Sequence, residues 1–158
     1  MSPLIKICGV RSEEIAVGAA LLGVDLIGFV FFPKSPRHVG PEAAETIVTA
    51  VKRAAEEKGV AAPHFVGLFV DAGEKTLAEA APFLSHFQFH GHEGPERCAA
   101  MSAEFGVEVI KAIPVASADD VAGAGEFEGA ADMLLFDAAA PKAAEKPGGN
   151  GVRFDWDL

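Results

Sequence analysis

The stretch "LIKICGVRSEEIAVGAALLG" (residues 4–23) contains the pattern that decides the fold. It begins with the short apolar run "LIKIC" and continues into "SEEIAVGAALLG", which has the features of a helix. Ser12 is a suitable N-cap, the two glutamates after it favour a first turn, and Gly23 closes the segment. The stretch therefore predicts one β-strand followed by one α-helix.

The same strand-then-helix pattern repeats along the chain. Each apolar run is short, rich in Val, Ile, Leu or Phe, and mostly without alternation, which is typical of strands buried on both faces. The six runs are residues 4–8, 26–32, 65–70, 86–90, 109–113 and 133–137, and the helical candidates between them are residues 12–23, 41–59, 74–83, 94–106 and 117–127. Regular alternation predicts an α/β fold with a parallel sheet, either an open doubly wound sheet or a closed (β/α) barrel.

Composition narrows the classes of function. A length of 158 residues fits one domain, residues 1–158. The net charge of −10 and the lack of a basic stripe argue against nucleic acid as a partner. No apolar run approaches the roughly 20 residues that span a bilayer, so we expect no membrane partner. We also expect no secretion signal, and the two cysteines suit a reducing, cytoplasmic location.

Reactive or charged side chains recur where the predicted strands end. In parallel α/β folds the loops after the strands gather at one end of the sheet, and sites are built there. The side chains at these positions are Cys8, Arg37, His38, Asp71, His90, Lys111 and Asp137. Each has an ordinary structural explanation when taken alone, but together they indicate a site.

Cys8 is the first candidate. Strand alternation places Leu4, Lys6 and Cys8 on one face, and Ile5 with its neighbour Ile7 on the other, where they would pack on helices. Lys6 or the start of the next helix would favour a reactive thiolate. A buried structural thiol is an equally good reading of Cys8, whereas Cys98 lies among alanines and is interpreted as packing.

Asp137 and the loop at residues 32–40 are the next candidates. A carboxyl group at a strand end can donate a proton, so Asp137 and Cys8 would form an acid–base pair for isomerisation, although a loop-capping aspartate is also common. The loop "FPKSPRHVG" holds the densest positive charge in the chain. Its Arg37 suits recognition of a planar carboxylate, although composition alone slightly favours an exposed, solubilising loop.

Two further segments are weaker candidates. "FQFHGHE" (87–93) suggests a metal site, but no matching set of ligands occurs elsewhere, so we expect no metal and interpret His90 as a polar contact in a pocket. The glycines of "KPGGNGVRF" (146–154), including Gly149, allow close approach of backbone to a ligand, or they form a mobile lid.

Seven stretches together resemble phosphoribosylanthranilate isomerase of tryptophan biosynthesis. They occur in the order of that family and cover nearly the whole chain: "KICGV", "GVDLIGFVFFPKSPRHV", "VGLFVD", "FQFHGHE", "VIKAIPV", "LLFD" and "GGNGVRFDW". The resemblance implies a (β/α) TIM-barrel type of fold and an Amadori rearrangement of a phosphorylated small molecule without a cofactor. It implies that Cys8 is the general base, that Asp137 is the general acid, and that Arg37 binds the anthranilate carboxylate.

The sequence also departs from the family. Asn150 stands where the family usually has Thr or Ser, and the chain ends after six of the eight βα units, so we expect the binding loops for the substrate phosphate to be missing. We expect open edges on the first and sixth strands, with possible self-association through them. The alternative function is a catalytically silent partial barrel that acts as an assembly or interaction module.

Overall fold

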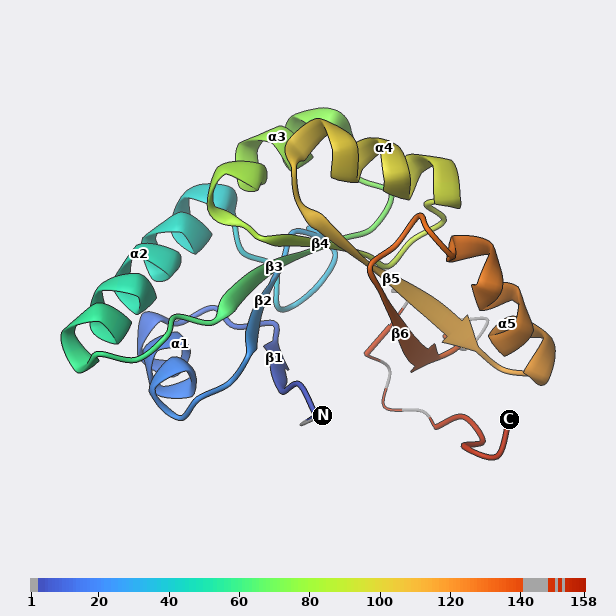
Figure 1. The fold of residues 1–158 in the computed structure, drawn as a ribbon, viewed down its shortest axis with the longest axis horizontal. Helices are drawn as coiled ribbons and strands as arrows, with labels where there is room; N and C mark the ends of the chain where they lie inside the picture. Colours follow the sequence, from blue (N-terminus) through green and yellow to red (C-terminus); the bar gives the residue numbers. More distant parts are fainter. Residues whose placement is uncertain (1–2, 141–147, 150, 152) are drawn as a thin grey trace. The chain divides into compact units, whose positions relative to one another are not determined.

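The computed structural model describes residues 3–140, 148–149, 151 and 153–158. The chain forms two compact units. The first comprises Met1–Leu68 and Ala72–His86, and the second comprises Phe69–Asp71 and Phe87–Leu158. Strands alternate with helices in both units, as the sequence predicts (Figure 1).

The first unit contains three strands in the order β1-β2-β3 among its described residues. The pairs β1–β2 and β2–β3 are both parallel. Its elements are β1 (Lys6–Cys8), α1 (Glu13–Leu21), β2 (Leu26–Val30), α2 (Pro41–Lys58), β3 (His64–Phe69), α3 (Glu74–Ala80) and a 3-10 helix (Ala81–Phe83). The last residue of β3, Phe69, belongs to the second unit.

The second unit repeats the pattern in its described residues. Its strand order is β4-β5-β6, and β5 and β6 are parallel. The elements are β4 (His86–Phe89), α4 (Pro95–Phe105), β5 (Glu108–Val115), α5 (Ala118–Gly123), a 3-10 helix (Ala124–Phe127) and β6 (Met133–Ala138). The first residue of β4, His86, belongs to the first unit. All six predicted strands and all five predicted helical segments are therefore confirmed, with ends shifted by a few residues.

Local sequence signals explain where the helices begin and end. Ser12 caps α1, and its hydroxyl oxygen accepts a hydrogen bond from the Ile15 amide at 3.4 Å. α2 begins at Pro41, which lacks the amide hydrogen that the first turn leaves unpaired. It ends at Gly59, whose φ of 66° is a left-handed conformation that glycine adopts without a side-chain clash.

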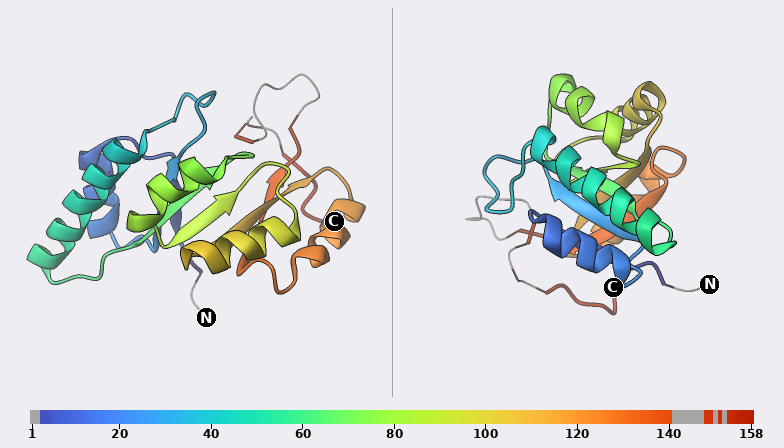
Figure 2. Two further views of the ribbon diagram at one scale, coloured as in Figure 1. Left: turned by 90° about the horizontal axis from the view of Figure 1, so that it is seen from above. Right: turned by 90° about the vertical axis from the view of Figure 1, so that its left-hand side faces the viewer.

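Each unit has its own apolar core. In the first unit all five residues of β2 are buried, and Phe29 stacks on Phe65 with ring centroids 6.3 Å apart. α1 and α2 run side by side in this unit (Figure 2). In the second unit Phe87 packs edge-on against Phe69 and also meets Phe105 of α4. Aromatic side chains thus attach the strands to one another and to their covering helix.

Two strands are less buried than predicted. Ile5 and Ile7 remain 53% and 40% exposed, so the prediction that this face of the first strand packs on helices is wrong. β1 is only three residues long, and α1 packs chiefly against α2 and β2. In the second unit, Leu134 and Phe136 of β6 are each 41% exposed. β6 therefore alternates between exposed and half-buried positions along most of its length.

Candidate active site

Cys8 lies at the carboxyl end of β1 with an exposed side chain. Lys6 is on the same face, as strand alternation predicts, and its Nζ donates a hydrogen bond to Cys8 Sγ at 3.4 Å. A thiolate is the form of cysteine that accepts protons and attacks electrophiles. The Cys8 sulfur therefore has both solvent access and an adjacent cation, which a buried packing thiol lacks.

Gly28 of β2 provides the space for this pair. It lies opposite Cys8 in the parallel register of β1 and β2. A Cβ atom on Gly28 would lie 2.8 Å from Cys8 Sγ and 3.3 Å from Lys6 Cε. A side chain here would therefore displace the sulfur from its position beside Lys6.

The loop after β2 brings Arg37 to the segment that carries Cys8. The aliphatic part of the Arg37 side chain packs directly on Gly9, where any side chain would clash with it, and Gly9 has a φ of 80° that suits glycine. A hydrogen bond also joins the loop after β2 to the segment after β1, because Arg11 Nη1 donates to the Pro36 carbonyl at 2.7 Å. Arg37 and Cys8, separate candidates in the sequence, are therefore neighbours within the first unit.

His38 has a different role from Arg37 in this loop. Its Nδ1 lies 3.2 Å from the Val30 carbonyl, and the amide of Val39 donates to the same carbonyl at 3.0 Å. His38 therefore attaches the end of the loop to β2.

Asp137 meets His90 in the second unit. His90 Nε2 lies 3.4 Å from Asp137 Oδ2, and the two side chains are 12% and 34% exposed. The His90 amide donates to the Phe69 carbonyl at 2.9 Å, which fixes the backbone at the end of β4. The other carboxylate oxygen of Asp137, Oδ1, accepts a hydrogen bond from the Ala138 amide at 2.9 Å. The carboxyl group is thus oriented, partly shielded from water, and in contact with a second titratable group.

The glycine-rich loop contributes Gly148 to the same place. A Cβ atom on Gly148 would lie 2.6 Å from His90 Nε2 and 2.7 Å from Asp137 Oδ2. The predicted close approach of the backbone therefore exists at Gly148. The groups that it approaches are the side chains of His90 and Asp137. Gly149 is exposed with a φ of 66°, and Asn150 lies outside the described residues.

A buried ion pair, which the sequence does not predict, supports the loop next to His90. Lys111 Nζ lies 3.3 Å from Glu93 Oε2, and both side chains are 5% exposed. Lys111 Nζ also donates to the Gly91 carbonyl, and the carboxylate of Glu93 accepts from the amides of Asp71 and Gly91. The only signals in the sequence were a lysine inside the apolar run "VIKAI" and a glutamate just after "FHGH".

Asp71 and His92 form a second pair in that loop. The Asp71 carboxylate contacts His92 Nδ1 at 2.9 Å and accepts from the His92 amide at 2.6 Å. The side-chain hydrogen bond from His92 holds the pKa of Asp71 below its usual range. The two histidines and the glutamate of "FHGHE" therefore have separate partners: Asp137 for His90, Asp71 for His92, and Lys111 for Glu93. Across the described residues, no cluster of three or more His, Cys, Asp or Glu side chains has the arrangement of a metal site.

Cys98 differs from Cys8 in its burial. It is fully buried in α4. Burial raises the pKa of the Cys98 thiol, because a thiolate there would be poorly solvated. The interpretation of Cys98 as a packing residue is confirmed.

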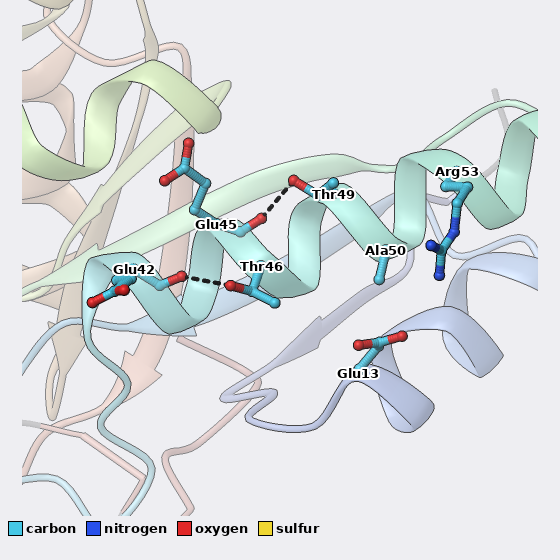
Figure 3. Close-up of a pocket in the computed structure, with 7 residues that line it drawn as sticks. All are labelled: Glu13, Glu42, Glu45, Thr46, Thr49, Ala50 and Arg53. Carbon is cyan, nitrogen blue, oxygen red and sulfur yellow. Dashed lines mark hydrogen bonds between the residues drawn. The ribbon is translucent and has the colours of Figure 1, made fainter.

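A hollow between α1 and α2 in the first unit contains none of the candidate residues (Figure 3). Glu13 of α1 and Arg53 of α2 face it, and the hydroxyls of Thr46 and Thr49 point back to helix carbonyls at 3.0 Å. In the described part of the chain, no helix is both long enough and apolar enough to cross a membrane.

Comparison with known proteins identifies the family. The family model for N-(5'-phosphoribosyl)anthranilate isomerase matches residues 5–158. The isomerase of Rhodospirillum rubrum is 48% identical over 157 residues, which cover 98% of this chain and 70% of the relative. An isomerase of Rhodopseudomonas palustris is 44% identical over 161 aligned residues, covering 100% of this chain and 70% of the relative.

Solved structures agree with the sequence comparison. The isomerase of Thermotoga maritima superposes with a TM-score of 0.79 at 31% identity, covering 99% of this chain and 70% of its own. A second isomerase structure holds reduced 1-(o-carboxyphenylamino)-1-deoxyribulose 5-phosphate and superposes with a TM-score of 0.74 at 29% identity, covering 87% of this chain and 66% of its own. The fold is thus a (β/α) barrel type, as predicted, with six strands and the helical segments between them in the described part of the chain. The chain belongs to the N-(5'-phosphoribosyl)anthranilate isomerase family.

Proposed function

We propose that this chain carries out the isomerisation of N-(5'-phosphoribosyl)anthranilate to 1-(o-carboxyphenylamino)-1-deoxyribulose 5-phosphate, a step of tryptophan biosynthesis. The observation that carries the proposal is the family match over residues 5–158, with Cys8 and Asp137 at the ends of β1 and β6. A related isomerase binds a reduced form of that product, which supports the same substrate class here.

The reaction needs one acid and one base. Asp137 gives a proton to the ring oxygen of the ribose, the bond from that oxygen to the anomeric carbon breaks, and the amine nitrogen supplies the electron pair of the resulting iminium ion. The Cys8 thiolate then takes the proton from the neighbouring carbon, and the electrons of that C–H bond neutralise the iminium. The enolamine formed in this way tautomerises to the ketone product, so the rearrangement needs no external oxidant or reductant.

The other site residues bind and orient in this scheme. Arg37 offers a planar guanidinium with paired donors, which suits the carboxylate of the anthranilate group. His90 lies against Asp137, so it orients the acid and contacts the part of the substrate that Asp137 protonates. Gly149 offers exposed backbone in the glycine loop as a further substrate contact. A single domain over residues 1–158, a cytoplasmic location, the absence of nucleic acid as a partner, and self-association through β1 and β6 stay predictions.

An activity assay tests the proposal directly. The purified chain is incubated with N-(5'-phosphoribosyl)anthranilate, and the carboxyphenylamino-deoxyribulose phosphate is separated by chromatography and measured by mass. We expect product to form at a rate proportional to the protein concentration, and to stop when Cys8 and Asp137 are both replaced by alanine. Product formation that is the same in the doubly substituted chain would contradict the proposal.

A further inference from the structure

We propose that Lys6 is a positioning residue whose positive charge holds the Cys8 sulfur as the thiolate. This inference rests on the proposed function, because a base must be in its deprotonated form before substrate arrives. The geometry that carries it is the hydrogen bond from Lys6 Nζ to Cys8 Sγ at 3.4 Å, between side chains on the same face of β1. Charge-assisted hydrogen bonds of this type favour the anionic partner.

Gly28 is part of the same arrangement. The absence of a side chain on Gly28 leaves room for Sγ and for the end of the Lys6 side chain at once, because a Cβ there would lie 2.8 Å from the first and 3.3 Å from Lys6 Cε. Without that space the sulfur would have to turn away from the ammonium group. Gly28 of β2 therefore allows the contact between Lys6 and Cys8, which both belong to β1.

The segments that follow β1 and β2 carry other charged side chains, and these have different contacts from those of Lys6. Arg37 packs its aliphatic part on Gly9, and Arg11 is bound to the Pro36 carbonyl. The glutamates at positions 13 and 14 lie in the first turn of α1, after its cap. Among the hydrogen bonds described for the Cys8 sulfur, the donor is Lys6, so the sulfur is paired with a cation on its own strand.

The exposure of Lys6 and Cys8 determines how strongly the lysine can act on the sulfur. Cys8 is exposed and Lys6 is half-buried, so water and salt weaken their attraction. We expect the charge of Lys6 to raise the rate at which Cys8 reacts at neutral pH by about five- to tenfold, the range for a close pair in a largely aqueous setting. At about 1 M salt, where the screening length falls to about 3 Å, most of this gain should vanish.

The test is alkylation of Cys8 by iodoacetamide, followed by mass spectrometry, in chains that carry Cys98→Ala so that one thiol remains. Lys6→Met should slow the reaction at pH 7 by about five- to tenfold and leave it unchanged near pH 10, because ordinary cysteine thiols are ionised at that pH without help from a cation. Lys6→Arg should retain most of the rate. Lys75→Met, which removes an exposed lysine of α3, is the charge-matched control and should have no effect.

Two outcomes would overturn the proposal. One is an equal rate for Lys6→Met and the parent chain at pH 7. The other is a loss that is the same at pH 7 and pH 10 and does not respond to salt, because that pattern would indicate a structural role. In a Gly28→Ala background the Lys6→Met effect should shrink, since the alanine separates the two side chains, and a full effect there would contradict the part assigned to Gly28.

The alkylation assay contains no substrate, so it is independent of the proposed function. Loss of the Lys6 effect with isomerase activity intact would overturn this inference alone. A clear Lys6 effect in a chain that makes no product would overturn the proposed function and leave the state of Cys8 as inferred.

Discussion

The side chain of His90 lies against that of Asp137, with His90 Nε2 3.4 Å from Asp137 Oδ2. One of these side chains comes from the end of β4 and the other from β6. The imidazole can donate to the carboxylate, which keeps the carboxyl group in one orientation at the end of its strand. A general acid needs such an orientation, because proton transfer requires hydrogen-bond distance to the reacting oxygen.

Replacing Asp137 by Asn tests its role as the acid. The amide keeps the shape and the contact with His90 but has no acidic proton to transfer. We expect kcat to fall by about a hundredfold or more, and KM to change little, because the group acts mainly in the transition state. Steady-state kinetics measure both. A large rise in KM with unchanged kcat would assign Asp137 to substrate binding instead.

Gly148→Ala tests the contact between the glycine loop and this pair. The new methyl group would lie 2.6 Å from His90 Nε2 and 2.7 Å from Asp137 Oδ2, so the loop or the two side chains must move. We expect at least about a tenfold loss of kcat, since small displacements of catalytic groups are costly, and little change in the midpoint of thermal unfolding. Gly125→Ala is the matched control, because a Cβ there meets no atom within 4 Å. Equal kinetics for the two variants would contradict the prediction.

The sequence predicts well the features that depend on the alternation of side chains along a strand and on the residues at the ends of strands and helices. Alternation along "LIKIC" places Lys6 and Cys8 on one face, and their hydrogen bond confirms it. The ends of α2 follow from Pro41 and Gly59. These features need only neighbours in the chain, so one sequence is sufficient to predict them.

What the sequence misses depends on the paths of loops and on register. Arg37 packs on Gly9, and Arg11 binds the Pro36 carbonyl, between loops that lie far apart in the sequence, so no local pattern encodes these contacts. The ion pair of Glu93 with Lys111 joins residues 18 positions apart on different elements. The burial of Ile7 is overestimated for the same reason, since apolar character alone does not say which helix covers a strand.

Cys8→Ala and Cys98→Ala separate chemistry from packing. Removal of the candidate base should lower kcat by about a hundredfold or more, with little effect on stability because Cys8 is exposed. Removal of the buried Cys98 should lower the free energy of unfolding by about 1 kcal/mol, as for other small cavities, with kcat unchanged. Kinetics and chemical denaturation of the two variants give the comparison. Similar losses of activity in both would contradict the assignment of Cys8.

Arg37→Lys tests recognition of a carboxylate. Lysine keeps the charge but loses the planar pair of donors, so we expect weaker binding of ligands that carry an anthranilate carboxylate, by about tenfold. Calorimetric titration with the reduced product, and with an analogue that lacks the carboxylate, measures the difference. The analogue should bind the variant and the parent chain equally. If neither ligand distinguishes the variant, Arg37 has no role in binding.

The Asp71–His92 contact predicts a pH dependence of stability. Hydrogen bonding from His92 lowers the folded-state pKa of Asp71 below its ordinary value of 3.8, so the carboxylate form is favoured by folding. Such a group contributes its full stability above the unfolded pKa and loses it as the pH falls through the lower folded pKa. We expect Asp71→Asn to unfold at lower denaturant concentration than the parent chain at pH 6, and the difference to disappear between about pH 4 and pH 2. Asparagine tolerates the φ of 48° at this position, so the backbone is preserved. Glu104→Gln, an exposed carboxylate change in α4, is the control and should show no such gap. A gap for Asp71→Asn that stays constant down to pH 2 would mean that His92 does not stabilise the ionised carboxylate.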